Sequence, residues 1–150
     1  MALSDWIDDL CDVFAMTVDT RLVHVYKYYS KPEFPEAISK FPCALTFPIS
    51  VKLGLSSGTS YDLWTGKTEI HVVPNAAKSS IPVLVPYFAA IRLAVATHVT
   101  LAGKVQYFQP VEAGESIIGP AELTYGSEAA HLGLVFYWTV KELVATTLSG

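Results

Sequence analysis

The segment PYFAAIRLAVATHVTL, residues 86–101, decides the fold because it predicts one long and nearly uncharged helix. One face collects six residues at helical spacing: Tyr87, Ala90, Ile91, Ala94, Val95 and His98. The opposite face is also mostly apolar, with Phe88, Arg92, Ala96 and Val99. A helix that is apolar almost all round leaves little surface for water. We therefore expect a sheet on one side, and either more of the same core or a second subunit on the other.

The ends of this helix have their own signals. Pro86 suits the first helical turn, where its missing N–H costs nothing, and Gly103 suits the left-handed position just past the end. His98 on an apolar helix is expected to be a hydrogen-bonded core or interface residue rather than a metal ligand.

Length and composition indicate one domain over residues 1–150 that hides surface in an assembly. Hydrophobic residues make up 51% of the chain and charged residues only 16%, against about 25% in typical soluble domains. Arg92 interrupts the longest apolar stretch, so we expect no membrane span. The start MALSDWIDDL lacks the basic residues of a signal peptide.

The charge and cysteine patterns exclude several other classes. Five of the 14 acidic residues precede the first basic residue, Arg21, so the net charge of −4 is local to the N-terminal segment. The chain has no clustered basic footprint of the kind that nucleic-acid readers show. Cys11 and Cys43 stand in no CxxC spacing, which is typical of two reduced, buried thiols.

Residues 4–16 predict an amphipathic helix with Ser4 as its N-cap. Its apolar face consists of Leu3, Trp6, Ile7, Leu10, Cys11 and Phe14. Its other face consists of Asp5, Asp8, Asp9 and Asp12. The acidic face is interpreted as solvated surface, with repulsion of DNA or attraction of a basic partner as the alternative.

Strands are predicted at residues 21–29, 43–53, 67–73, 104–109, 121–125 and 132–141, with loops at 31–42 and 110–120. Pro48 inside the second strand indicates an edge position or a bulge. The last strand alternates strictly and is apolar on one face. The predicted fold class is therefore α+β: a single domain with a mixed or antiparallel sheet, an N-terminal amphipathic helix and a central apolar helix packed on the sheet.

Residues 54–66, GLSSGTSYDLWTG, predict a long hairpin loop. Its glycines and serines favour a flexible connection, but Tyr61, Leu63 and Trp64 are costly to leave in water. The loop is therefore either functional or folded back onto its own sheet.

No constellation for catalysis, metal binding or cofactor binding is found in the sequence, and we do not expect an enzyme. Residues 54–58 match G-x-S-x-G, but a nucleophile elbow needs a helix after the serine, and another strand is predicted there. A small hydrolase using Ser56 is thus only an alternative of a different class. The four histidines (His24, His71, His98 and His131) show no metal-ligand spacing. Glu112 and Glu115 are interpreted as a solvated pair.

Four stretches give the chain a family resemblance. They are FPCALTFP at 41–48, YDLWTGKTEIHVVP at 61–74, THVTLAGKVQYF at 97–108 and GLVFYWTVKE at 133–142. Together with the predicted order of helices and strands, they resemble the tail-terminator, or tail-completion, proteins of long-tailed bacteriophages.

The resemblance implies a structural virion protein. Such proteins form a ring, usually of six subunits, which caps the tail tube, stops tube polymerisation and provides the joint to the head connector. The family's tube-contacting loop would correspond to residues 55–65, with Leu55, Tyr61, Asp62, Leu63 and Trp64 as contact residues. The ring interface would include Phe88, Arg92, Ala96 and Val99.

The resemblance also implies the partners and the location. The expected partners are further copies of the chain, the tail-tube protein and the head connector, and DNA would pass the lumen without specific binding. The protein would assemble in the host cytoplasm and stay in the virion at the head–tail junction. A head-closure or connector protein is the alternative in the same class, and a small-ligand module using the aromatic loops is one from another class.

Overall fold

The computed structural model describes residues 3–15, 17–18, 21–22, 24–26, 38, 41–56, 59–74, 81–111, 114–126 and 130–144. The helices are α1 (Leu3–Val13) and α2 (Ile81–Thr97). The strands are β1 (Thr17–Val18), β2 (Arg21–Leu22), β3 (His24–Tyr26), β4 (Cys43–Ser56), β5 (Thr59–Val73), β6 (Tyr107–Pro110), β7 (Ile117–Leu123) and β8 (His131–Val144). The α+β class is as predicted. In the described ranges, no helix combines the length and hydrophobicity needed to cross a membrane.

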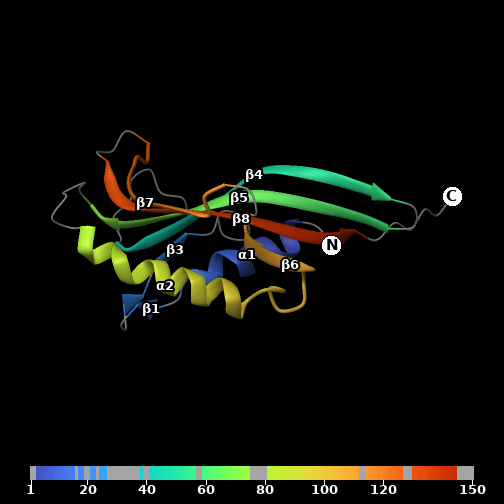
Figure 1. Cartoon of the computed structure of the whole chain (residues 1–150), viewed down its shortest axis with the longest axis horizontal. Helices are drawn as coiled ribbons and strands as arrows, with labels where there is room; N and C mark the ends of the chain where they lie inside the picture. Colours follow the sequence, from blue (N-terminus) through green and yellow to red (C-terminus); the bar gives the residue numbers. More distant parts are fainter. Residues whose placement is uncertain are drawn as a thin grey trace.

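Six strands form one mixed sheet around the long strands β4, β5 and β8 (Figure 1). The order is β3-β4-β5-β8-β6, and β7 also pairs with β8. Only the β3–β4 pair is parallel. β7 pairs with the first half of β8 and β6 with the second half, so they follow one another along the same edge. β1 and β2 form a separate two-stranded sheet.

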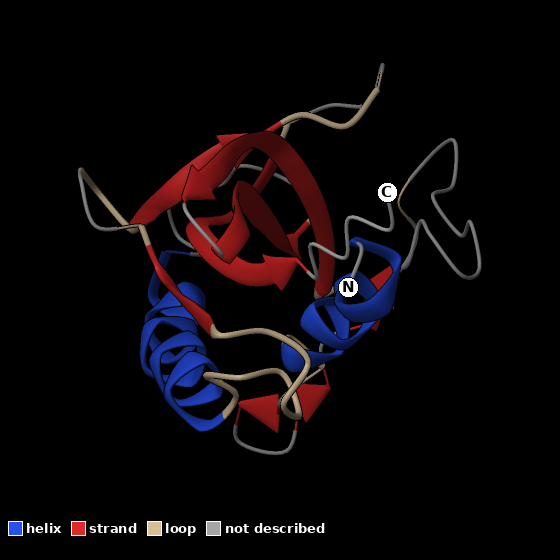
Figure 2. Cartoon of the chain, turned by 90° about the vertical axis from the view of Figure 1, so that its right-hand side faces the viewer, coloured by secondary structure: helices blue, strands red, loops and turns tan. Residues whose placement is uncertain are grey.

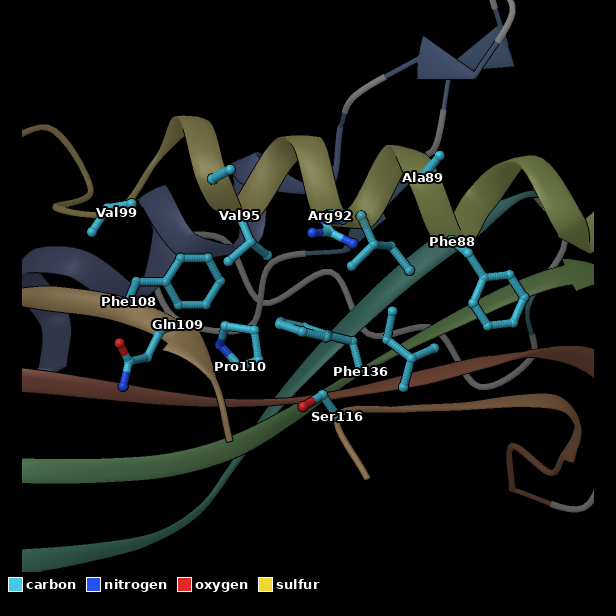
Figure 3. A pocket seen from close by; sticks show the side chains of 13 residues that line it. Phe88, Ala89, Arg92, Val95, Val99, Phe108, Gln109, Pro110, Ser116 and Phe136 are labelled. Carbon is cyan, nitrogen blue, oxygen red and sulfur yellow. The ribbon is translucent and has the colours of Figure 1, made fainter. Parts of the chain in front are cut away.

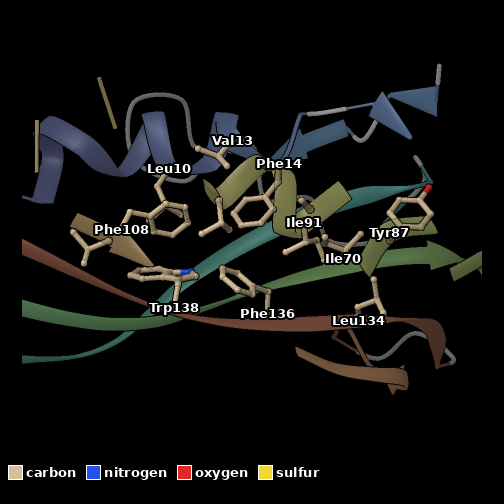
Figure 4. Packing of buried hydrophobic residues seen from close by; sticks show 14 of the residues in the cluster. Leu10, Val13, Phe14, Ile70, Tyr87, Ile91, Phe108, Leu134, Phe136 and Trp138 are labelled. Carbon is tan, nitrogen blue, oxygen red and sulfur yellow. The ribbon is translucent and has the colours of Figure 1, made fainter. Parts of the chain in front are cut away.

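Both helices lie on the same side of this curved sheet, and the main core fills the space between them and the strands (Figures 2 and 4). The predicted alternation of the last strand is confirmed, because its apolar face is buried: Leu132, Leu134, Phe136, Trp138 and Val140. The apolar face of α1 is buried against them, with Trp6, Ile7, Leu10, Cys11 and Phe14. Burying each large side chain of this kind contributes about 1.5–3 kcal/mol. The helices are therefore held to the sheet by side chains that the sequence periodicity identifies.

The central helix has the predicted faces but different ends. It begins at Ile81, so Pro86 lies inside it and the prediction of Pro86 in the first turn is wrong. Pro82, the second residue of α2, takes that place, where a missing N–H leaves no bond unmade. The helix ends at Thr97, and the chain then reverses through left-handed residues that include Gly103, with φ of 80°.

The predicted loop at 54–66 is wrong, because this stretch is mostly strand. β4 runs to Ser56 and β5 starts at Thr59, so the two form a long antiparallel hairpin. Pairing of β5 with β8 on its other side makes β5 a central strand, and this long-range contact overrides the local preference of glycine and serine. The bulge expected at Pro48 is confirmed by a register shift between Pro48 and Ser50.

The remaining boundaries shift by a few residues. α1 ends at Val13 rather than at residue 16. The strand predicted at 21–29 is observed as the short β2 and β3, and residues 23 and 27–29 lie outside the described part. The strand predicted at 104–109 starts at Tyr107. β7 begins at Ile117, inside the predicted loop at 110–120, and ends two residues before the predicted end at 125. Residues 31–37 of the first predicted loop and Glu112 lie outside the described residues.

The acidic face of α1 is only partly solvated. Asp5 and Asp12 are exposed, but Asp9 pairs with Lys104 at 2.5 Å, which ties α1 to the turn after α2. The hydrogen bond and the charge of Asp9 raise the pKa of Lys104 above its usual range. Asp8 is half-buried, and its Oδ1 has no hydrogen-bond partner.

Candidate functional site

A groove with a volume of about 750 Å³ runs between α2 and the edge of the sheet (Figure 3). Its helix wall consists of Phe88, Ala89, Ile91, Arg92, Val95, Ala96 and Val99. Its sheet wall consists of Phe108, Gln109, Pro110, Ser116, Ile117 and Phe136. The volume is in the range of ligand pockets and of hydrophobic interface pockets. The walls come from one helix and three strands, which makes the groove a fixed feature of the fold.

The four residues predicted for a ring interface are brought together here, since Phe88, Arg92, Ala96 and Val99 all line the groove. This follows from the two faces of α2. Tyr87, Ile91 and Ala94 point into the core and are almost completely buried. The residues on the opposite side of the helix, Arg92 and Ala96, are therefore exposed. Val99 follows two residues after the end of α2 and is 45% exposed.

Among the described residues that line this apolar groove, Arg92 is the one with a charge. Its side chain is exposed, and the ion pairs found among the described residues do not include it. Farther along the outer side of α2, Val85 and Leu93 are each about 60% exposed. An apolar surface with a single cation is suited to bind another apolar surface that offers a carboxylate.

The second notable surface is the arm, which we define as residues 49–56 of β4, 59–65 of β5 and 139–144 of β8. It projects past α2 and β6 (Figure 1). On β4 the arm exposes Ile49, Val51 and Leu53, the last by 68%. Beyond Leu45, the only described strand that pairs with β4 is β5, so no described strand pairs with the other edge of β4 in the arm.

The residues predicted for tube contact all lie in the arm, but on two faces. Asp62 pairs across the strands with Leu53, and Trp64 pairs with Val51, on the face that the helices cover farther along. Tyr61 and Leu63 alternate with them and belong to the other face. Leu55 lies at the end of β4, and its side chain is outside the described part.

Tyr61 is held on that outer face by its neighbours. A Cβ atom at Gly54 would lie 2.1 Å from the Tyr61 ring, so the ring requires a glycine beneath it. The Lys141 ammonium lies 4.6 Å from the centre of the same ring, within cation–π range. Tyr61 is therefore a fixed and half-buried aromatic side chain rather than a mobile loop tip.

Trp64 belongs partly to the subunit's own core. It packs at the edge of the main cluster, and its ring meets Trp6 edge-on with 6.0 Å between ring centres. The indole N–H groups of Trp6 and Trp64 donate to the two carboxylate oxygens of Glu142, at 3.0 and 3.3 Å. Burial raises the pKa of Glu142 above its ordinary value, although the two indole donors oppose that shift.

Sequence reasoning missed this carboxylate. The signal was present, because Glu142 continues the apolar phase of Trp138 and Val140 and therefore had to point into the core side of the sheet.

Sequence reasoning also treated the histidines as scattered, whereas the fold pairs two of them. The Nδ1 atoms of His71 and His131 lie 3.0 Å apart in a buried site on the face of the sheet away from the helices. The Nε2 atom of His71 lies 3.1 Å from the Glu69 carboxylate, which also pairs with Lys67. Burial alone would raise the pKa of Glu69, but the hydrogen bonds from His71 and Lys67 lower it overall.

These groups do not form a metal centre: in the part of the chain that the structure describes, no cluster of three or more His, Cys, Asp or Glu side chains suits a metal ion. His98 instead makes a bond of 2.8 Å to the carbonyl of Ala94, as expected for a hydrogen-bonded residue. Cys11 and Cys43 are buried, as predicted.

The serine motif does not gain the geometry of a nucleophile elbow. Ser56 ends β4, and the next described element is the strand β5 rather than a helix. The requirement for a sharp strand-to-helix turn is therefore not met at this serine.

Comparisons of the chain with protein-family models and with curated proteins find no match. The groove and the arm are thus the features from which a function has to be argued.

Proposed function

We propose that this chain is the subunit of a ring that ends a phage tail tube and joins it to the head. The observation that carries the proposal is the groove on α2, whose walls include the four apolar or cationic residues Phe88, Arg92, Ala96 and Val99. An exposed apolar groove on the surface of a small domain is typical of a contact with another protein. A ring, expected to have six subunits from the family resemblance, repeats that contact around its axis.

The arm provides a second observation that supports the same proposal. A three-stranded projection that extends beyond α2 can reach the neighbouring ring of the tail, and its outer face offers Tyr61 and Leu63. Tyrosine is among the residue types that dominate binding energy at interfaces, and Leu63 extends the apolar surface beside it. A repeated weak contact adds up to firm attachment when six copies engage together. The contact with the tube would therefore be made by strands of the arm, not by a flexible loop.

The test combines assembly with attachment. We expect size-exclusion chromatography with light scattering to give an oligomer, electron microscopy to show rings, and mixing with tubes of the tail-tube protein from the same genome to place a ring at one end and halt growth. A protein that neither oligomerises nor binds these tubes contradicts the proposal. A ring that binds the head connector but not the tube would instead identify a head-closure protein. Ester hydrolysis lost in Ser56→Ala would identify a hydrolase.

A further inference from the structure

Two apolar surfaces of different shape lie on the same chain, and we propose that one surface of each copy binds the other surface of a neighbouring copy. We infer that Val51 and Leu53 of the arm of one subunit dock into the α2 groove of the next, with Asp62 of the first facing Arg92 of the second. The inference rests on the proposed ring, whose subunit contact it specifies. The concave partner is the groove of about 750 Å³, and the convex partner is the exposed β4 segment.

The two surfaces differ, and this decides the type of symmetry. A two-fold contact places the same patch against itself, whereas a groove and a protrusion at different places on one chain make a head-to-tail contact. Head-to-tail contacts close into rings when the rotation between copies divides a full turn. In Figure 1 the arm projects away from α2, so the protrusion of one copy cannot fill the groove of the same copy.

The charges of the two surfaces are complementary. Of the described residues in the groove wall, Arg92 alone is charged, and the described ion pairs do not include it. Asp62 is the cross-strand partner of Leu53, so a carboxylate lies directly beside the most exposed apolar side chain of the arm. Asp62 is half-buried, and its charge also disfavours the ionised form of nearby Glu142. A cation from a neighbouring copy would relieve that repulsion.

The edge of β4 favours docking by side chains over addition of another strand. Strand addition needs a regular ladder of free N–H and C=O groups. Pro48 lacks the N–H, the register shifts between Pro48 and Ser50, and Lys52 places a charge on the edge. These are the devices by which sheets block edge-to-edge pairing. The apolar side chains of the edge remain exposed, which leaves them to fill a pocket.

The first test introduces one charge into either surface. Leu53→Asp and Val99→Asp should each raise the dissociation constant for self-association at least about tenfold, because a carboxylate would be buried in an apolar contact. Both residues are exposed in the subunit, so its melting temperature should stay unchanged. Lys52→Asp, on the same strand but on the opposite face, is the matched control and should leave assembly as in the wild type.

Mixing the two defective variants tests the head-to-tail geometry. A Leu53→Asp subunit keeps an intact groove and a Val99→Asp subunit keeps an intact arm, so the mixture should form a dimer and stop there. Two-fold or unrelated interfaces do not predict a dimer of defined composition. The charge pair is tested in the same way: Arg92→Asp and Asp62→Arg should each weaken assembly, and the double variant should restore it.

Several results would overturn the inference. If the wild type forms rings that bind tubes while Leu53→Asp rings keep the same size, the arm-to-groove contact is wrong and the proposed function stands. If the wild type is monomeric at its highest soluble concentration, the inference fails for the free protein. If that monomer takes up an apolar dye and Val99→Asp does not, the groove is a small-ligand site instead. If wild-type rings form but bind no tube, the inference survives and the proposed function fails.

Discussion

The indole N–H of Trp6 donates a hydrogen bond of 3.0 Å to Oε2 of Glu142, which lies 136 residues later in the chain. This bond joins α1 to the last strand within the arm, where Glu142 pairs with Asp62 of β5. The second oxygen of the same carboxylate accepts the indole N–H of Trp64 on β5. One buried side chain thus links three elements: the first helix and two strands of the arm. We infer that Glu142 fixes the direction in which the arm leaves the body of the subunit.

Replacing this carboxylate should destabilise the subunit. Glu142→Leu leaves the N–H of Trp6, which is fully buried, without an acceptor, and an orphaned buried donor costs about 1–3 kcal/mol. The half-exposed Trp64 can turn to water, so Trp64→Phe should cost less than Trp6→Phe. Urea unfolding measures the difference, with Glu122→Leu at an exposed position of β7 as control. Equal stability of Glu142→Leu and the wild type would show that the carboxylate is dispensable.

The two buried carboxylates should give the unfolding free energy opposite pH dependence. The pKa of Glu142 is raised in the folded state, so the folded protein binds a proton before the unfolded one does. The contribution of Glu142 to stability therefore increases as pH falls through its folded pKa toward 4.5. The pKa of Glu69 is lowered, so its contribution is present above 4.5 and is lost as pH falls through its folded pKa.

Two isosteric variants separate these effects. The stability gap between the wild type and Glu142→Gln should change in favour of the wild type as pH falls from neutral toward 4.5, whereas the gap for Glu69→Gln should shrink as pH falls below 4.5. Denaturant midpoints at these pH values provide the measurement. The same sign for both variants would contradict the assigned pKa shifts.

The buried histidine pair should be a further source of stability. The two Nδ1 atoms bond only if one imidazole donates and the other accepts, and a proton on His71 Nε2 toward Glu69 leaves His71 Nδ1 as the acceptor. His131→Leu removes the donor and leaves a buried nitrogen unsatisfied, which should cost about 1–3 kcal/mol. His98→Leu, just after the end of α2, is the control and should cost less, because His98 is only partly buried, whereas His71 and His131 are buried. If both variants lose the same stability, the pair has no special role.

Periodicity was sufficient to predict the parts of the fold that one element determines alone. The alternation in β8 and the two faces of α2 follow from side chains that are neighbours in sequence, and both predictions are confirmed. The hairpin of β4 and β5 was missed because Gly54 and Ser56 favour a loop locally, while the pairing with β8 that overrides them joins residues about 80 positions apart. Tertiary pairing of this kind leaves no local signal.

The candidate site was predictable to the same extent. The helix wall of the groove follows from the spacing of Phe88, Arg92 and Ala96, but the opposite wall depends on how Phe108 and Phe136 pack beneath the helix. The pairing of His71 with His131 is also beyond sequence reasoning, because it requires a particular register between β5, β8 and β7. Residues that approach each other only through register cannot be identified from spacing.

The arm allows the tube contact to be separated from the core of the subunit. Trp64→Ala should lower the melting temperature, because its ring packs against the core cluster and Trp6, and loss of a large buried aromatic costs about 3 kcal/mol when burial is complete and less here. Leu63→Asp, on the outer face and half-buried, should leave the fold intact but weaken attachment to tail tubes. Tyr61→Phe keeps the ring over Gly54 and should bind tubes as the wild type does if the contact is apolar.

Co-sedimentation of each variant with assembled tubes measures attachment, and a melting curve of the free protein measures stability. Ile118→Asp on β7, away from the arm, is the control for a new surface charge. If Leu63→Asp sediments with tubes as well as the wild type does, the outer face of the arm is not the contact surface. If Ile118→Asp is as defective as Leu63→Asp, the loss reflects net charge rather than position. The expected result is a loss of tube attachment that is confined to variants on the outer face of the arm and leaves the melting temperature unchanged. This result would assign the contact to Tyr61 and Leu63, because Asp62 and Trp64 alternate onto the other face.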